Sequence, residues 1–431
     1  MSVKDFVQQR RDDFIAMRRD FHIYPEPAWL EYRSASKVAE KLISLGYDVA
    51  LGADVLDLDS RMGLPSEEVM KAAMARAMDE GADPELVEKM GYGKTAIVAT
   101  MKFSDDGPVV AFRADMDSND VIESKASNHT PAKNGFRSRH EKAMHACGHD
   151  THMTMGLGLA EYIATHKDGL KGTIKLIFQP AEEGVRGAKA MVKAGVVDDV
   201  DLMFGMHIGF NEQLSSCFAC SDHGFLATTK LDAVFHGYSS HAGGSPEKAQ
   251  NAMLAGCTAV INLQAIARHS GGASRMNVGV FESGTGRNVT PDVATLKLET
   301  RGATTEINDY MIERTKTIIK GAAEMHDCTF EITKQGETPA GRISDDLARE
   351  VQSIIEPLGI FKEVPFDYSG GGSEDCAYFL NRVIDRGGRA TYMVLGSAIK
   401  APHHNPLFDI DEEDMLNGIV ALGTIATHYL K

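Results

Sequence analysis

Short apolar runs that end in polar, chemically active residues constrain the fold of this chain more than any other feature. Four such runs occur, each with the residues that follow it: Val109–Arg113 before Asp115-Met116-Asp117, Thr173–Phe178 before Glu182-Glu183, Leu202–Met206 before His207, and Thr391–Leu395 before His403-His404. Runs this short, separated by helical segments, predict an α/β fold with a mostly parallel sheet that helices flank. Ligands of open α/β sheets bind at the carboxyl ends of the strands, so the four runs predict one common site.

The stretch from about residue 225 to 335 has a different pattern. It predicts, in order, a strand, a long helix, two strands, a second helix and a last strand: Thr229–Phe235, Pro246–Ala267, Met276–Phe281, Ala294–Thr300, Glu306–Met325 and Thr329–Thr333. This βαββαβ order is that of the ferredoxin-like unit. We therefore expect residues 225–337 to form an inserted α+β domain, and residues 1–224 and 338–431 to form the metal-bearing domain.

A further segment, about residues 53–91, interrupts the metal-bearing domain. Ser66-Glu67-Glu68-Val69 has the pattern of a helix start, and Met70, Met74 and Met78 recur at every fourth position. This spacing predicts a small helical insertion that packs a methionine stripe inward. A cover over the active-site cleft or a contact with a partner protein stays open as an alternative.

Composition excludes several classes of protein. A chain of 431 residues with a formal net charge of −16 lacks the basic field that binding to nucleic acid requires. No apolar run approaches the roughly 20 residues of a membrane span, and the first residues lack the apolar core of a signal peptide. The six cysteines are scattered, which indicates reduced thiols and a cytoplasmic protein. Cys217 and Cys220 have the spacing of a redox motif, but we interpret them as two strand residues.

Two segments concentrate metal-binding groups: His145-Ala146-Cys147-Gly148-His149-Asp150 and Phe178-Gln179-Pro180-Ala181-Glu182-Glu183-Gly184. Cys147 and His149 are one residue apart, so both side chains project to the same side of an extended segment. Asp150 is placed as the N-cap of a helix over 151–164. Thiolate, imidazole and carboxylate together form the ligand set of a divalent metal site.

Glu182 and Glu183 are adjacent, so we expect their side chains to point in different directions. One carboxylate can then bind metal while the other acts as a general base. A hydrolase with Cys147 as nucleophile and His149 as base is the alternative, and it would keep its activity after removal of metal.

With these motifs, four more segments carry a family resemblance: Arg18-Arg19-Asp20-Phe21-His22, Phe112–Asp117, Ser240-His241-Ala242 and Ser373-Glu374-Asp375. The chain resembles the dinuclear-metal amidohydrolase and peptidase family that includes aminoacylases, carboxypeptidase G and plant auxin-conjugate hydrolases. The cysteine motif is typical of the branch that acts on acyl and aryl conjugates of amino acids.

The resemblance implies two divalent ions, Mn²⁺ or Zn²⁺, and five ligands. His149 and His207 would hold one ion, Glu183 and His404 the other, and Cys147 would lie between them. His404 is preferred to His403 because it directly precedes Asn405-Pro406. The resemblance also makes Glu182 the general base, and Asp117 a residue that orients a ligand without binding metal.

Within the expected inserted domain, the resemblance gives His241 the task of polarising the scissile carbonyl, often from the other subunit of a dimer. Asn288 and Arg301 match residues that contact the substrate carboxylate, and Gly371 could present a backbone amide to the same substrate. One departure concerns Ser118-Asn119, where the family usually has Ala-Leu, so the acyl pocket is expected to differ.

The expected activity is hydrolysis of an amide between an aryl or acyl group and an amino acid, with p-aminobenzoyl-glutamate as the favoured substrate. The alternatives are hydrolysis of indole-acetyl-aspartate or of another N-acyl-amino acid, and the role of a non-catalytic partner subunit. A homodimer, or a heterodimer with a homologous B subunit, is the expected assembly, with no nucleic-acid or membrane partner.

Overall fold

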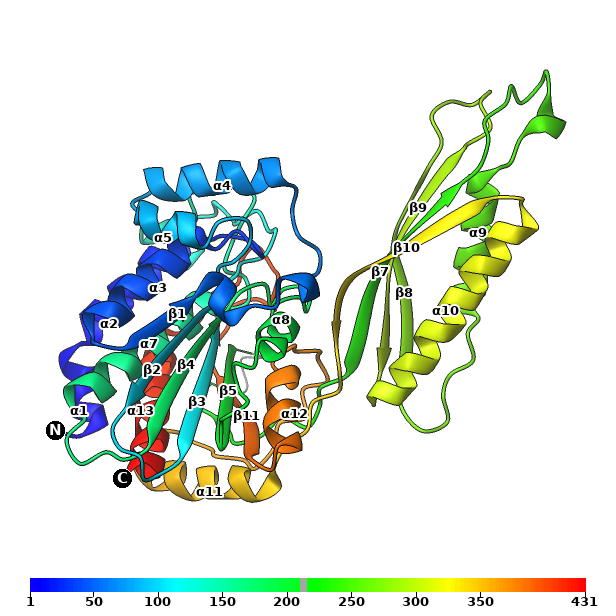
Figure 1. The fold of residues 1–431 in the computed structure, drawn as a ribbon. Helices are drawn as coiled ribbons and strands as arrows, with labels where there is room; N and C mark the ends of the chain where they lie inside the picture. The colour runs from blue at the N-terminus through cyan, green and yellow to red at the C-terminus, as the bar shows by residue number, and fades with distance from the viewer. Residues whose placement is uncertain (210–214) are drawn as a thin grey trace. The chain divides into compact units, whose positions relative to one another are not determined.

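The computed structural model describes residues 1–209 and 215–431, which divide into two compact units (Figure 1). The first unit comprises Met1–Gly224, Gly341–Gly371 and Asp375–Lys431, and the second comprises Phe225–Ala340 and Gly372–Glu374. Among the described helices, none has both the length and the apolar character that a bilayer crossing requires.

The first unit is built on a seven-stranded sheet in the order β1-β2-β4-β3-β5-β11-β6. The four central strands β4, β3, β5 and β11 are parallel, while β1, β2 and β6 pair antiparallel at the two edges. The predicted α/β class is thus confirmed, with a sheet that is mixed and parallel only at its centre. The strands are β1 (Asp48–Leu51), β2 (Ile97–Lys102), β3 (Val109–Asp115), β4 (Thr173–Gln179), β5 (Leu202–Gly209), β6 (Phe218–Ala219) and β11 (Arg389–Gly396).

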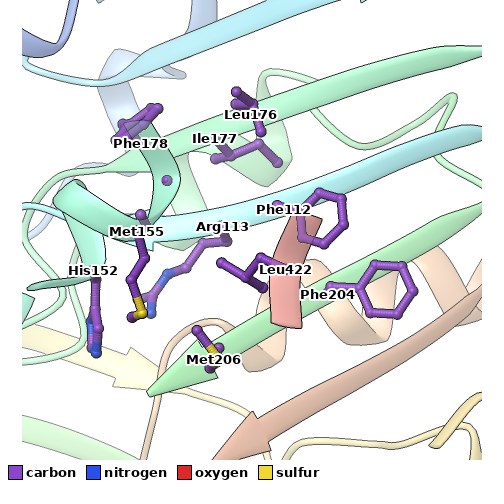
Figure 2. A pocket seen from close by; sticks show the side chains of 12 residues that line it. Phe112, Arg113, His152, Met155, Leu176, Ile177, Phe178, Phe204, Met206 and Leu422 are labelled. Atoms are coloured by element: carbon purple, nitrogen blue, oxygen red, sulfur yellow. The ribbon is translucent and has the colours of Figure 1, made fainter. Parts of the chain in front are cut away.

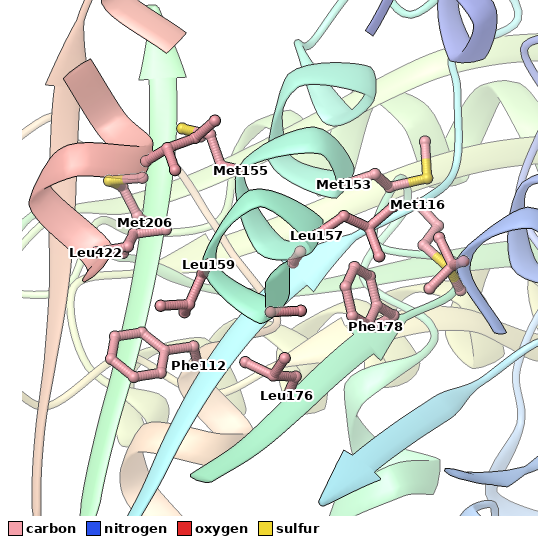
Figure 3. Packing of buried hydrophobic residues seen from close by; sticks show 14 of the residues in the cluster. Phe112, Met116, Met153, Met155, Leu157, Leu159, Leu176, Phe178, Met206 and Leu422 are labelled. Carbon is pink, nitrogen blue, oxygen red and sulfur yellow. The ribbon is translucent and has the colours of Figure 1, made fainter. Parts of the chain in front are cut away.

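Helices cover this sheet. The helix α7 packs on β3, β4 and β5 and against α13, whereas α12 packs on β5 and β11. Figure 3 shows apolar side chains of α7, such as Leu157 and Leu159, above Phe112, Leu176 and Phe178 of the sheet. A Cβ on Gly156 would lie 3.0 Å from the ring of Phe178, so a glycine permits this close approach. The helices are α1 (Val3–Gln9), α2 (Arg11–Ile23), α3 (Tyr32–Ser44), α4 (Glu67–Asp79), α5 (Pro84–Lys89), α6 (Thr130–Lys133), α7 (His149–Thr165), α8 (Ala188–Lys193), α11 (Asp345–Ile355), α12 (Ala377–Asp385) and α13 (Glu412–Leu430).

The segment between β1 and β2 leaves and rejoins the sheet at one edge. Leu51 pairs with Ile97, and Ile97 pairs with Phe178 near the end of β4. The segment, which contains α4 and α5, therefore begins and ends beside the carboxyl ends of the central strands. Met70 is buried and Met74 partly buried, as the stripe predicts, but Met78 is exposed.

The helix that follows the cysteine motif starts earlier than predicted. It begins at His149 with Gly148 (φ +87°) as its cap, so Asp150 lies in the first turn instead of at the cap. A Cβ on Gly148 would lie 2.8 Å from Ile208, which leaves room only for glycine. The Asp150 carboxylate instead bonds the side chains of Arg18 and His22.

The second unit has the predicted βαββαβ order and a four-stranded antiparallel sheet, β10-β7-β9-β8. Its long first helix is shorter than predicted, because Gln250 pairs with Tyr238 and Asn251 then caps the helix. The elements are β7 (Ala227–His236), α9 (Ala252–Gln264), β8 (Ser274–Ser283), β9 (Val293–Gly302), α10 (Thr305–Met325) and β10 (Thr329–Thr338).

Candidate metal centre

The five predicted ligands lie at the carboxyl edge of the first unit's sheet. Cys147 and His149 flank the start of α7, Glu183 follows β4, and His404 follows β11. His207 lies inside β5, which continues to Gly209, so the prediction that the strand ends before this histidine is wrong. The strand is longer because β11 pairs with it up to Gly209.

Two groups of possible ligands share Cys147. In Cys147, His149 and His207, and again in Cys147, Glu183 and His404, the ligand atoms all lie within 4.8 Å of one another. The Sγ of Cys147 is 3.4 Å from Nε2 of His207, and Nε2 of His404 is 3.5 Å from a carboxylate oxygen of Glu183. Both groups mix sulfur, nitrogen or oxygen donors in the manner of a transition-metal site.

Hydrogen bonds orient two of the histidines. Nδ1 of His149 donates to the backbone carbonyl of Asp117 at 2.7 Å, and Nδ1 of His207 donates to the carbonyl of Ile208 at 2.8 Å. This tautomer leaves Nε2 of each ring as the electron-pair donor toward the cluster. Nε2 of His149 is buried and has no hydrogen-bond partner in the described part of the chain.

The charges around His149 also suit a cation. Burial alone would lower the pKa of His149, but the carboxylates of Asp115, Asp117 and Glu183 raise it to about 10. A buried cluster with this excess of negative groups attracts a positive charge, either a proton or a metal ion. The orphaned Nε2 and the donor set together fit a bound divalent metal.

Glu182 and Glu183 sit on a tight turn after β4. The two oxygens of Asp117 accept their backbone N–H groups, each at 2.9 Å. The two side chains do not diverge as we expected: each carboxylate has an oxygen 4.0 Å from Nε2 of His149. The turn explains this, since Val185 N–H donates back to the carbonyl of Glu182 and the segment is not extended.

Sequence reasoning missed a supporting pair, Asp115 and His152. Nδ1 of His152 donates to Asp115 at 2.6 Å, and its Nε2 accepts the backbone N–H of Ile208, next to His207. His152 is three residues after His149 and so shares its helix face, which is the signal that could have found it. Figure 2 shows His152 and Arg113 beside a cavity that is lined mainly by apolar core side chains, including Phe112, Phe178 and Phe204. This cavity belongs to the core.

His403, the other candidate, directly precedes His404 in the chain. It packs on His207, with 5.2 Å between ring centroids, and on Phe408. His404, with φ +61°, turns its Nε2 to Glu183. This arrangement favours His404 as the ligand.

The second unit holds His241, Asn288 and Arg301. His241 pairs with Val289, and Ala242 N–H donates to the carbonyl of Asn288, so the first two residues lie together. Nδ1 of His241 accepts N–H groups of Gly243 and Gly244, which leaves Nε2 of this exposed ring as a donor. Arg301, on β9, pairs with Glu299 at 3.0 Å. Gly371 ends a segment of the first unit with φ +77°.

Comparison with known proteins identifies the family. Residues 111–428 match Peptidase family M20/M25/M40. The chain belongs to this family. It is 45% identical to indole-3-acetyl-aspartic acid hydrolase of Enterobacter agglomerans over 99% of this chain and 98% of that protein. It is 44% identical to the A subunit of p-aminobenzoyl-glutamate hydrolase of Escherichia coli K12, with the same coverage.

A solved structure supports the fold as well. The crystal structure of an aminobenzoyl-glutamate utilization protein from Klebsiella pneumoniae superposes with a TM-score of 0.84 at 39% identity, covering 100% of this chain and 98% of that one. Membership in the M20 family makes the chain a metal-dependent hydrolase of the amidohydrolase type, as the motifs predict.

Proposed function

We propose that this enzyme hydrolyses the amide bond between an aryl or acyl group and an acidic amino acid, with p-aminobenzoyl-glutamate as the favoured substrate. The observation that carries the proposal is a complete cluster of five ligand side chains with the carboxylate of Glu182 beside it. The names of two relatives with over 40% identity support conjugates of glutamate or aspartate. The first of them makes indole-acetyl-aspartate the second candidate.

In this proposal Cys147, His149, Glu183, His207 and His404 hold two divalent ions. Such ions polarise a bound carbonyl and lower the pKa of a bound water molecule to about 7. Glu182 takes the proton of the attacking water and passes it to the leaving amine. Asp117 fixes this chemistry in place through the backbone of Glu182 and Glu183 and through the ring of His149.

Three residues of the second unit, together with Gly371 of the first unit, would complete the site. His241 donates a hydrogen bond to the developing oxyanion, while Asn288 and Arg301 bind the substrate carboxylate and Gly371 offers a backbone amide. Release of Arg301 from Glu299 would make its guanidinium available for this role. We propose accordingly that residues 225–337 form a lid and dimerisation domain, and that residues 1–224 and 338–431 form the catalytic domain.

The proposed enzyme uses Mn²⁺ or Zn²⁺, is cytoplasmic and is a dimer. The sulfur and nitrogen ligands suit Zn²⁺ by softness, whereas the habit of the resembling branch favours Mn²⁺. A cytoplasmic location fits the six cysteines, none of which forms a disulfide within the described residues. A homodimer, or a heterodimer with a homologous B subunit, is the proposed assembly, because the Escherichia coli relative is by its name one component of a larger enzyme.

A panel of conjugates tests the proposal. Apo-enzyme is reconstituted with Mn²⁺ or Zn²⁺ and offered p-aminobenzoyl-glutamate, indole-acetyl-aspartate and matched conjugates of neutral amino acids. We expect turnover of an acidic conjugate only with metal. Activity that survives chelation would favour Cys147 as a nucleophile, and no hydrolysis of any conjugate would favour a non-catalytic subunit.

Glu182→Gln tests the base. The substitution removes the proton acceptor and leaves all five ligands, so we expect normal metal content and a turnover lower by about 10²–10⁴-fold. Metal analysis beside single-turnover kinetics measures both quantities. A near-normal rate would exclude Glu182 as the base.

A further inference from the structure

The turn that carries Glu182 and Glu183 is strained. In this corner, defined here as residues 180–188, Ala181 has φ +54° and Val185 has φ +59°. Residues other than glycine rarely adopt such angles, because the Cβ atom crowds the neighbouring backbone there. Such a conformation persists only where neighbouring groups hold it.

Buried carboxylates from three distant segments hold the corner by its backbone N–H groups. Asp117 accepts from Glu182 and Glu183, and Asp375 accepts from Gly187 at 3.1 Å and Ala188 at 3.0 Å. The third is Glu31, whose Oε1 accepts the N–H of Ala181 at 2.8 Å. Glu31 therefore bonds the strained residue that directly precedes the proposed base.

The side chain of Glu31 does not cap its own helix. Glu31 occupies the N-cap position of α3, yet its side chain makes no capping hydrogen bond there. Glu26 accepts hydrogen bonds from the first turn of this helix instead, since its two carboxylate oxygens accept the N–H groups of Arg33 at 3.0 Å and Ser34 at 2.8 Å. The side chain of Glu31 is thus able to reach the corner, about 150 residues away in sequence.

The surroundings of Glu31 disfavour an ionised carboxyl group. The side chain is fully buried, and its other donors in the described residues are Trp29 N–H at 2.9 Å and the Thr95 hydroxyl at 2.6 Å. Burial, together with the nearby carboxylate of Asp117, raises the pKa of Glu31 to about 8. Burying an acid among neutral donors opposes folding. The hydrogen bond from Ala181 N–H, which fixes the backbone of the corner, gives a reason for an acid at this position.

We propose that Glu31 is a positioning residue of the hydrolytic reaction, which holds the Ala181 N–H and thereby aims Glu182 at the site. The kinetic part of this inference rests on the proposed role of Glu182 as the base. The structural part, a clamp on the corner, does not. Glu26 supplies a matched control, because it is an equally buried glutamate five residues away that accepts two backbone N–H groups without touching the corner.

The test compares Glu31→Ala, Glu31→Gln and Glu26→Ala as metal-loaded full-length enzyme. We expect Glu31→Ala to keep its metal content and KM but to lose about 10²-fold in kcat, the effect of misplacing a catalytic group by about 1 Å. Glu31→Gln keeps an oxygen for the Ala181 N–H and should retain most of kcat. Glu26→Ala should lower the melting temperature and leave kcat unchanged.

Hydrogen exchange of peptides that cover the corner provides a readout independent of Glu182. Glu31→Ala should speed exchange there, and Glu26→Ala should not. Three outcomes would each overturn the clamp. They are equal kcat losses in the two alanine variants, a Glu31→Gln variant as slow as Glu31→Ala, and hydrogen exchange of the corner that is unchanged in Glu31→Ala. A fully active Glu182→Gln would instead overturn the base, and the exchange result would still judge the clamp. If Glu31→Ala does not fold, Glu31→Asp against Glu26→Asp makes the same comparison, because the shorter side chain cannot reach Ala181.

Discussion

At the scale of single residues, Asn119 is the departure from the family pattern with the clearest structural consequence. Burial raises the pKa of the Glu183 carboxyl, but the hydrogen bond from His404, the charge of His149 and, to a smaller extent, the hydrogen bond from the Asn119 side chain lower it to about 2. The side-chain oxygen Oδ1 of Asn119 is buried without a hydrogen-bond partner in the described residues. A group that orients a metal ligand in this way commonly contributes about 10–100-fold to metal affinity.

Asn119→Leu, which introduces the usual residue of the family, therefore tests this orientation. We expect weaker metal binding, by about 10-fold or more, because Glu183 loses its amide donor. Competition with a fluorescent chelator measures the affinity. Ser118→Ala is the control, since the Ser118 hydroxyl is also buried without a partner in the described part of the chain and should not matter. Equal affinities in all three proteins would show that Asn119 does not orient Glu183.

At the scale of elements, a buried ionic network joins α2 to the start of α7. Nδ1 of His22 donates to Asp150 at 2.8 Å, and its Nε2 donates to Glu123 at 3.1 Å. Burial by itself lowers the pKa of His22, but these two carboxylates outweigh it and raise the pKa to about 9. Both ring nitrogens donate, so the ring is an imidazolium at neutral pH.

The raised pKa of His22 predicts how stability depends on pH. The ring contributes stability fully below its unfolded pKa of about 6.5, and this contribution is lost as pH rises through about 9. At about 1.4 kcal/mol per pH unit between the two pKa values, the free energy of unfolding falls by a value on the order of 3 kcal/mol. Urea unfolding of metal-free protein at pH 6 and pH 9.5 measures it. His22→Gln should show a flatter dependence, whereas exposed His428→Gln should behave as the unaltered chain. If the free energy of unfolding of His22→Gln depended on pH as strongly as that of the unaltered chain, the dependence could not be assigned to His22.

The elements themselves were largely predictable, and the boundaries that failed have physical causes. Short apolar runs located β3, β4, β5 and β11 because parallel strands buried on both faces leave that pattern. The start of α7 was misplaced because Asp150 resembles a cap, while the backbone needs glycine at 148. The candidate ligands were predictable from residue type, and their role stays a prediction. The clamp by Glu31 was not, because a contact across about 150 residues leaves no local signal.

At the scale of the whole molecule, the ligands and the substrate-binding candidates lie on different units. The five proposed metal ligands and Glu182 belong to the first unit, and His241, Asn288 and Arg301 belong to the second. If the proposed roles hold, a substrate would contact residues of both sets. The resemblance adds that His241 can serve the site of a neighbouring protomer.

Mixing two inactive variants tests that possibility. If His241 acts across the dimer, a mixture of His241→Ala and Glu182→Gln should regain part of the activity, because each mixed dimer has one site with both unaltered groups. The activity is measured after subunit exchange has been verified by mass spectrometry. Exchange without any recovery of activity would mean that His241 acts within its own chain or has no catalytic role.

The division of the chain between its two units also sets an order of events during synthesis. The βαββαβ elements of the second unit span one uninterrupted stretch, so this unit can fold while the ribosome is still adding residues. The first unit cannot finish at that stage, because β11, the proposed ligand His404 and α13 follow the second unit in the sequence. The nascent chain therefore presents four of the five proposed ligands before the fifth exists. If these five residues hold the metal, the complete site can form only after His404 has been added.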